Sequence, residues 1–180
     1  MTRYISLLRG INVSGQKKIK MAELKAMYEA LGWKEVVTYI QSGNVLFTTK
    51  ATRPEQLIDT IREQIKITFG FEVKVFVYVS TDFEEAIQAN PFLPKPSEDF
   101  KKLQLTFLAA LPSEELLTTL VDFQSGTDEF QINGQFIYLY CPDGYGRTKL
   151  SNNFFERKLK VSATTRNWNS VLKLHALVKA

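Results

Sequence analysis

A guanidinium, two amides and an indole stand side by side near the end of the 180-residue sequence, and the first two kinds of group can bind an anion: Arg166, Asn167, Trp168 and Asn169. They come just before an apolar pattern typical of a helix, and the start of a helix needs only one capping side chain. One asparagine can be that cap, and Trp168 is expected to pack into the core. Arg166 and the second amide have two alternative roles. They hold the terminal helix through hydrogen bonds to backbone carbonyls, or they line a pocket for an anion.

A second group of basic residues precedes this stretch. Arg147 and Lys149 follow a glycine-rich segment, and a capping box of Asn153 and Glu156 predicts a helix over residues 152–159. The first turn of a helix has free N–H groups and partial positive charge, which suit phosphate or carboxylate. Arginine adds a planar set of donors that matches these anions. The sequence therefore predicts an anion-binding region, with the candidate residues Arg147, Lys149, Arg166 and Asn167.

The loop after the first predicted strand has the sequence GINVSGQK over residues 10–17. It is similar to the phosphate-binding loop pattern, but its lysine is displaced by one residue: Gln16 stands where that pattern needs lysine, Lys17 follows, and no serine or threonine comes next. Two alternatives remain. The loop presents N–H groups to an anion, or it is a solvated loop with ordinary surface lysines. The candidate binding residues here are Arg9, Asn12, Lys17 and Lys20.

Three polar residues, Gln41, Ser42 and Asn44, lie at the predicted tip of a hairpin. Turn formation explains Ser42 and Asn44 well and Gln41 less well, and all three are candidate ligand-binding residues. On the flanking strands, Tyr39 and Phe47 could stack nucleic-acid bases, as on RNA-recognition sheets. The basic-glycine-aromatic signature of those sheets is missing, so the two rings are expected to be core residues.

The sequence offers few residues for catalysis. His175 is the only histidine, which excludes a site with several histidine ligands, and it is expected to be a packed, hydrogen-bonded core residue. Cys141 is the only cysteine and is expected to be a buried, unreactive thiol. It allows no internal disulfide, so a reducing, cytoplasmic location is predicted. A Cys–His dyad would require the fold to join these two residues. We predict no cofactor and no metal ion.

Charge is unevenly distributed along the chain, although the net charge of +4 is modest. Residues 1–50 carry a net charge of +5 and residues 147–180 carry +7, whereas residues 103–146 contain six acidic residues and no Lys or Arg. The ends and the middle could neutralise one another in the fold. Alternatively, the two ends converge on one positive surface for an anionic partner. No apolar run approaches the roughly 20 residues that span a membrane, so no membrane partner is predicted.

The periodicity of apolar residues predicts an α+β fold of two ferredoxin-like plaits. Residues 1–80 have the order β-α-β-β-α-β. Residues 103–180 have the order β-α-β-β-α, with a terminal helix where a fourth strand is expected. Residues 81–102 form a helix and a proline-rich linker containing Pro91, Pro94 and Pro96. A single larger mixed sheet is the alternative. The expected strands span residues 4–10, 36–41, 44–49, 72–79, 103–111, 128–133 and 135–141, and the expected helices span residues 21–31, 54–69, 81–89, 112–121, 152–159 and 167–178.

Four stretches in order span nearly the full chain: LLRGINVSGQKKIKM, TYIQSGNVLF, GRTKLSNNFFERKL and ATTRNWNSVLKL. Together they resemble the bacterial domain-of-unknown-function family 1697 (DUF1697). The first stretch departs from the usual family pattern at Ser14, where glycine is usual, and this change could narrow the freedom of the loop backbone. The resemblance implies a soluble protein of two α+β plaits and no established activity. The residues that match the family motifs are Arg9, Gly10, Asn12, Gln41, Ser42, Asn44, Arg147, Lys149, Arg166, Asn167 and Trp168.

These observations predict a cytoplasmic protein that binds a phosphate-bearing ligand, either a small molecule or nucleic acid, through a basic surface. The loop after the first strand and the C-terminal basic segments would form this surface. A first alternative is an enzyme acting on a small anionic metabolite, with Arg147, Arg166 and Lys17 holding its charge and Gln41 or Asn44 orienting it. A second alternative is a protein–protein interaction module whose charged ends form salt bridges in a dimer.

Overall fold

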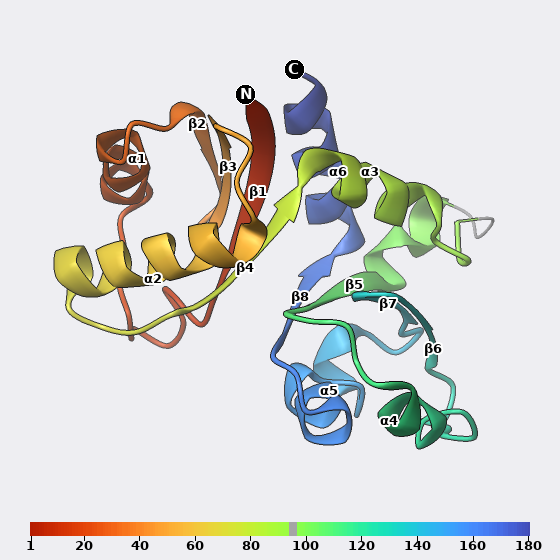
Figure 1. Ribbon diagram of the computed structural model, residues 1–180. Helices are drawn as coiled ribbons and strands as arrows, with labels where there is room; N and C mark the ends of the chain where they lie inside the picture. Colours follow the sequence, from red (N-terminus) through yellow and green to blue (C-terminus); the bar gives the residue numbers. More distant parts are fainter. Residues whose placement is uncertain (94–96) are drawn as a thin grey trace. The chain divides into compact units, whose positions relative to one another are not determined.

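The computed structural model describes residues 1–93 and 97–180, and the chain divides into two compact units (Figure 1). The first unit comprises Met1–Glu85 together with Leu174–Ala180, and the second comprises Ala86–Lys173. Two helices, α3 (Ser80–Gln88) and α6 (Trp168–Lys179), cross the boundary between the units. Of the predicted proline-rich linker, Pro94 and Pro96 lie outside the described residues.

The first unit has the predicted βαββαβ order. Its four strands are β1 (Thr2–Arg9), β2 (Lys34–Tyr39), β3 (Asn44–Thr49) and β4 (Lys74–Val79). Its two helices in this order are α1 (Met21–Ala30) and α2 (Pro54–Phe69). The strands form one antiparallel sheet with the order β2-β3-β1-β4.

The core of the first unit lies between one face of this sheet and helices α1 and α2 (Figure 1). Phe47 of β3 contacts the rings of Tyr4, Tyr28 and Trp33, with ring centroids 5.6, 5.4 and 4.3 Å away. Phe47 is therefore a core residue, as expected. Helix α2 begins with a proline in its first turn, which suits that position because its N–H group would have no helical acceptor. Its predicted apolar stripe is buried at Leu57, Ile61 and Ile65.

The second unit has its own antiparallel sheet, with the order β6-β7-β5-β8. Its strands are β5 (Leu103–Leu108), β6 (Glu129–Asn133), β7 (Phe136–Tyr140) and β8 (Ala163–Asn167). Its helices are α4 (Glu114–Thr118) and α5 (Asn152–Leu159), with the short 3₁₀ turns η1 (Ser97–Lys102) and η2 (Tyr145–Arg147). The two units thus form two α+β plaits, and no single mixed sheet joins the described strands.

Strand β8 is the fourth strand of the second plait, which the sequence prediction left out, whereas the predicted terminal helix is present as α6. It pairs antiparallel with β5, so that Thr165 lies opposite Thr106 and Arg166 opposite Leu105. The sequence did not predict this strand because ATTRN is short and mostly polar, and its hydrogen-bond partners lie about 60 residues earlier in the chain. Helix α6 begins at Trp168, directly after this strand.

The start of helix α5 also corrects the sequence prediction. Ser151 caps this helix, because its Oγ accepts a hydrogen bond of 3.2 Å from the N–H group of Phe154. Asn153 and Glu156 lie inside the helix, so the predicted capping box is wrong. Serine in the extended conformation just before the helix satisfies a free N–H group of the first turn, and this cap lies two residues earlier than the predicted one.

Candidate ligand-binding site

Asn12 ties together two of the predicted site segments of the first unit. Its Nδ2 donates hydrogen bonds to the carbonyl oxygens of Ile19, at 3.0 Å, and Gln41, at 2.9 Å. Its Oδ1 accepts a hydrogen bond of 2.8 Å from the N–H group of Ile19. The amide thereby closes the loop after β1 and fastens it to the β2–β3 turn. Both the nitrogen and the oxygen of the Asn12 side-chain amide are therefore used in holding the fold together.

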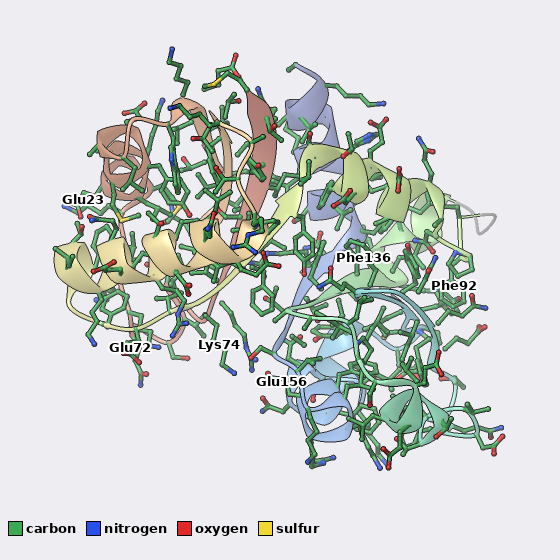
Figure 2. The ribbon with its side chains drawn as sticks, viewed as in Figure 1. Glu23, Glu72, Lys74, Phe92, Phe136 and Glu156 are labelled. Atoms are coloured by element: carbon green, nitrogen blue, oxygen red, sulfur yellow. The ribbon has the colours of Figure 1, made fainter. Side chains whose placement is uncertain are left out.

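The basic residues of this loop are largely engaged within the protein. The Nζ of Lys17 donates a hydrogen bond of 2.7 Å to the carbonyl oxygen of Glu72, which Figure 2 labels. Lys20 forms an exposed ion pair of 3.7 Å with Glu23. Arg9 lies opposite Lys74 across β1 and β4. The pKa of Lys74 is lowered, first by desolvation of its ammonium group and then by repulsion from Arg9.

The β2–β3 turn is built by its own polar residues. Asn44 is buried, and its Nδ2 donates to the carbonyl oxygen of Tyr39 at 3.0 Å and to the Oγ of Ser42 at 2.9 Å. Strand β2 ends at Tyr39, so Gln41 belongs to a four-residue turn rather than to the strand, where it was expected. Its carbonyl oxygen accepts the bond from Asn12. These bonds support turn formation as the role of Ser42 and Asn44.

Arg166, Asn167 and Trp168, at the start of helix α6, have different structural roles. Asn167 caps the helix, because its Oδ1 accepts a hydrogen bond of 2.8 Å from the N–H group of Ser170. Trp168 is fully buried, as expected. Arg166 donates to the Oγ1 of Thr164 and to the carbonyl oxygen of Thr165, both at 3.0 Å. Burial lowers the pKa of Arg166 to about 10.

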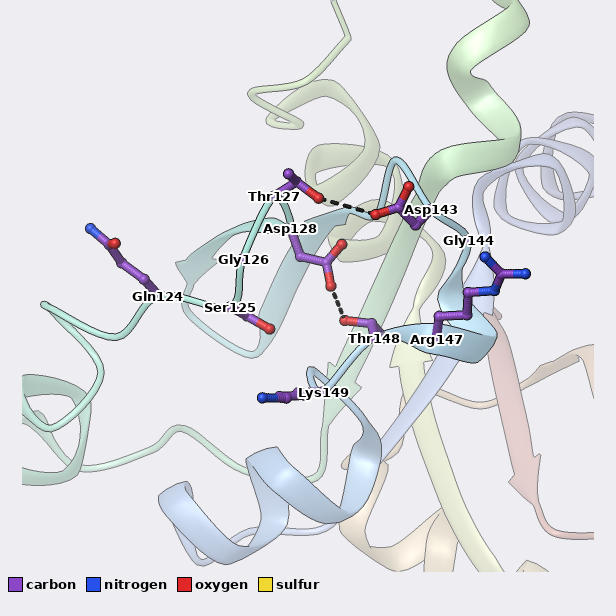
Figure 3. Close-up of a pocket in the computed structure, with 10 residues that line it drawn as sticks. All are labelled: Gln124, Ser125, Gly126, Thr127, Asp128, Asp143, Gly144, Arg147, Thr148 and Lys149. Atoms are coloured by element: carbon purple, nitrogen blue, oxygen red, sulfur yellow. Dashed lines mark hydrogen bonds between the residues drawn. The ribbon is translucent and has the colours of Figure 1, made fainter.

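A pocket of about 480 Å³ lies within the second unit, between two of its loops (Figure 3). One loop precedes β6, and the other connects β7 to α5 through η2. The pocket brings together two of the predicted site residues, Arg147 and Lys149. Arg166 is not among its lining residues. The residues that line it are Gln124, Ser125, Gly126, Thr127, Asp128, Asp143, Gly144, Arg147, Thr148 and Lys149.

Two hydrogen bonds between threonine and aspartate join the loops of the pocket (Figure 3). The Oγ1 of Thr148 donates to Asp128 Oδ2 at 2.6 Å, and the Oγ1 of Thr127 donates to Asp143 Oδ2 at 3.3 Å. Thr148 Oγ1 also accepts a hydrogen bond of 3.1 Å from the N–H group of Leu150. Each loop therefore contributes one carboxylate that is held by a neutral hydroxyl of the other loop.

The cations of the pocket are not paired with these carboxylates. Within the described part of the chain, neither the guanidinium of Arg147 nor the ammonium of Lys149 makes a hydrogen bond or ion pair, and both side chains are exposed. The two point in different directions from the segment that carries Thr148 (Figure 3). Two acidic and two basic side chains thus line one neutral pocket, in which the positive groups remain available to a ligand.

Cys141 lies next to this site but is not part of its lining. It is a buried free thiol, as expected, and burial raises its pKa to about 11, although a hydrogen bond with Thr148 lowers it in part. A thiol with this pKa is protonated at neutral pH and therefore a poor nucleophile. In the first unit, His175 Nε2 lies 3.4 Å from the carboxylate of Glu84.

The chain matches a family model described as a protein of unknown function, DUF1697, over residues 1–138. It belongs to the DUF1697 family. This DUF1697 protein is also similar in structure to the conserved bacterial protein SP0830 from Streptococcus pneumoniae, with a TM-score of 0.74 and 25% sequence identity over 98% of each chain. No curated protein matches the chain. The family match ends before Arg147, whereas the similarity in fold covers both units.

Sequence reasoning missed the acidic half of the pocket in this DUF1697 protein. It did not single out Asp128 or Asp143, or the threonines that hold them. A usable signal was present, because glycine-containing turns surround both aspartates in the stretches SGTD and PDGYG. The predicted convergence of the two basic ends on one surface stays a prediction. Within residues 1–93 and 97–180, no group of three His, Cys, Asp or Glu side chains could hold a metal ion, and no helix has the length and apolar character needed to cross a membrane.

Proposed function

We propose that this DUF1697 protein is a cytoplasmic binding protein for a small phosphate-bearing ligand, which occupies the pocket of the second unit. The observation that carries the proposal is the pair of unbonded cations, Arg147 and Lys149, in a pocket whose carboxylates are bonded to threonines. The buried free thiol of Cys141 is compatible with a reducing compartment.

The chemistry of the two cations suits a phosphate group. The guanidinium of Arg147 can donate two parallel hydrogen bonds to phosphate oxygens. The ammonium of Lys149, which points in another direction (Figure 3), adds a compact positive charge when its flexible side chain turns toward the ligand. Pairing with Asp128 or Asp143 would neutralise these cations, but the threonine hydroxyls occupy one oxygen of each carboxylate instead. The volume of about 480 Å³ lies within the usual range for small-molecule sites.

A small ligand fits these features better than a nucleic acid. A continuous phosphate backbone crossing the pocket would meet the carboxylates of Asp128 and Asp143 as well as the cations. In the first unit, Lys17 and Lys20 have partners within the protein. Phosphate contacts along a nucleic acid require several cations together, and they give binding that weakens steeply with salt.

The test is isothermal titration calorimetry of the full chain with inorganic phosphate, sugar phosphates and nucleoside monophosphates. Arg147→Gln and Lys149→Gln should each weaken binding by about tenfold or more, because each removes a charge-assisted hydrogen bond. Lys173→Gln is the matched control: it removes one exposed cation of the same unit from outside the pocket, and it should leave binding unchanged. Equal affinity of all three variants and the wild type would contradict the proposal. Salt-dependent binding of single-stranded RNA in place of small phosphates would favour the nucleic-acid form.

A further inference from the structure

We infer that the ligand is a phosphorylated sugar, in which hydroxyl groups beside the phosphate are recognised by the two aspartates of the pocket. This inference rests on the proposed function, since it assigns a role to the acidic half of the same site. Asp143 is exposed and Asp128 is half-buried, and both line the pocket with Arg147 and Lys149. The pocket therefore contains two cations, which can donate hydrogen bonds to an anion, and two carboxylates, which can accept hydrogen bonds from other groups of the same ligand.

The presence of the carboxylates argues against a ligand that consists of phosphate alone. Each carboxylate repels a phosphate, so the two aspartates reduce the affinity that the two cations provide. A site for inorganic phosphate would do better without Asp143, whose carboxylate accepts one hydrogen bond from the described residues, at the long distance of 3.3 Å, from Thr127. The carboxylate becomes useful when the ligand presents a donor next to its phosphate.

Neutral hydroxyl groups are the donors that suit this arrangement. An ionised carboxylate has two oxygens with about four acceptor positions, so a threonine bond leaves capacity for further donors. Thr148 already binds Asp128 by an O–H donor at 2.6 Å, and a sugar hydroxyl would make the same kind of bond. A ligand ammonium group could also bind a carboxylate, but it would lie in the same pocket as two unbonded cations, which repel it.

The inference predicts that one substitution, Asp143→Asn, changes the affinities for ribose 5-phosphate and inorganic phosphate in opposite directions. Wild-type protein should bind ribose 5-phosphate roughly tenfold more tightly than inorganic phosphate, because hydrogen bonds to a charged acceptor add to those of the phosphate. Asp143→Asn removes the negative charge and keeps the size of the side chain. It should weaken binding of ribose 5-phosphate several-fold and strengthen binding of inorganic phosphate. Asp122→Asn, an exposed change outside the pocket lining, should alter neither.

Calorimetry or ligand-observed NMR with inorganic phosphate, ribose 5-phosphate, ribose and phosphoethanolamine separates the outcomes. The expected result is preference for ribose 5-phosphate, together with the opposite changes caused by Asp143→Asn. If no phosphate compound binds, the proposed function fails and the inference fails with it. If phosphates bind but Asp143→Asn strengthens both phosphate probes, the proposed function stands and the inference is overturned. Tighter binding of phosphoethanolamine than of ribose 5-phosphate would also overturn it, in favour of an amine.

Discussion

The β2–β3 turn allows a stringent test of the structural role assigned to its residues. Gly43 has φ of +81°, and an added Cβ would lie 2.7 Å from Leu8 Cβ and 2.8 Å from Ile11 Cδ1. Both neighbouring side chains are buried, so a shift of either one disturbs the packing of the core. Gly70, at the end of α2, has the same φ but no heavy atom within 4 Å of an added Cβ. The two positions therefore share the conformational cost of alanine and differ in the space available.

Alanine at the two positions should have different costs. A left-handed conformation costs a residue with a Cβ about 1–2 kcal/mol, and this is the whole expected loss in unfolding free energy for Gly70→Ala. Gly43→Ala adds overpacking against Leu8 and Ile11, which typically costs about 1–3 kcal/mol. The expected total for Gly43→Ala is therefore about 2–5 kcal/mol.

Urea unfolding measures these losses, provided that the slope of free energy against urea is the same for both variants. Hydrogen exchange of the Leu8 amide gives a local measure, because this N–H group donates to the carbonyl oxygen of Gly43 at 2.8 Å. The Leu8 amide should exchange faster in Gly43→Ala than in Gly70→Ala. If Gly43→Ala loses no more stability than Gly70→Ala, the turn can relax around the new methyl group, and the requirement for glycine is refuted.

Two further predictions concern the pocket and the buried tyrosines. Thr148→Val removes the donor to Asp128 and the acceptor of the Leu150 N–H group, so it should cost about 1–3 kcal/mol in urea unfolding. Thr148→Ser keeps the hydroxyl and should lose less unfolding free energy than Thr148→Val. Equal losses for the two variants would contradict a stabilising role of these two hydrogen bonds. Burial raises the pKa of Tyr138 to about 12 and also raises that of Tyr28, so the stability that their neutral forms contribute is complete below pH 10. Stability should fall as pH rises above 10, and an unchanged melting temperature between pH 10 and 12 would contradict this.

The elements predicted correctly from the sequence are those with a strong local pattern. Helix α2 shows a stripe at helical spacing between a proline and a glycine, and its predicted bounds agree with the structure. Strand β8 has no such pattern, because its residues ATTRN are mostly polar and its pairing with β5 is distant in sequence. The signal for this strand was its place in the order of elements. The first unit has four strands, whereas the elements predicted for the second unit included only three, which left a strand missing between α5 and α6.

The site was only partly predictable for a related reason. Residue type and nearby charge are enough to single out Arg147 and Lys149 as anion-binding candidates. The partners of a polar side chain depend on the folded arrangement. Asn12 bonds to Gln41, 29 residues later, and Thr148 bonds to Asp128, 20 residues earlier. No local pattern distinguishes an amide that holds a loop from one that binds a ligand.

The hydrogen bonds within each unit separate structural residues from available ones among the predicted candidates. Asn12, Asn44 and Asn167 all use their amides to satisfy backbone groups, which is the common role of asparagine in loops and caps. Arg147 and Lys149 have no such bond within the described residues and share a pocket with acceptors. A charged group that stabilises the fold is expected to have a protein partner, whereas a group that binds a ligand must have free hydrogen-bonding capacity. The search for a ligand therefore begins in the second unit, with substitutions of these two residues.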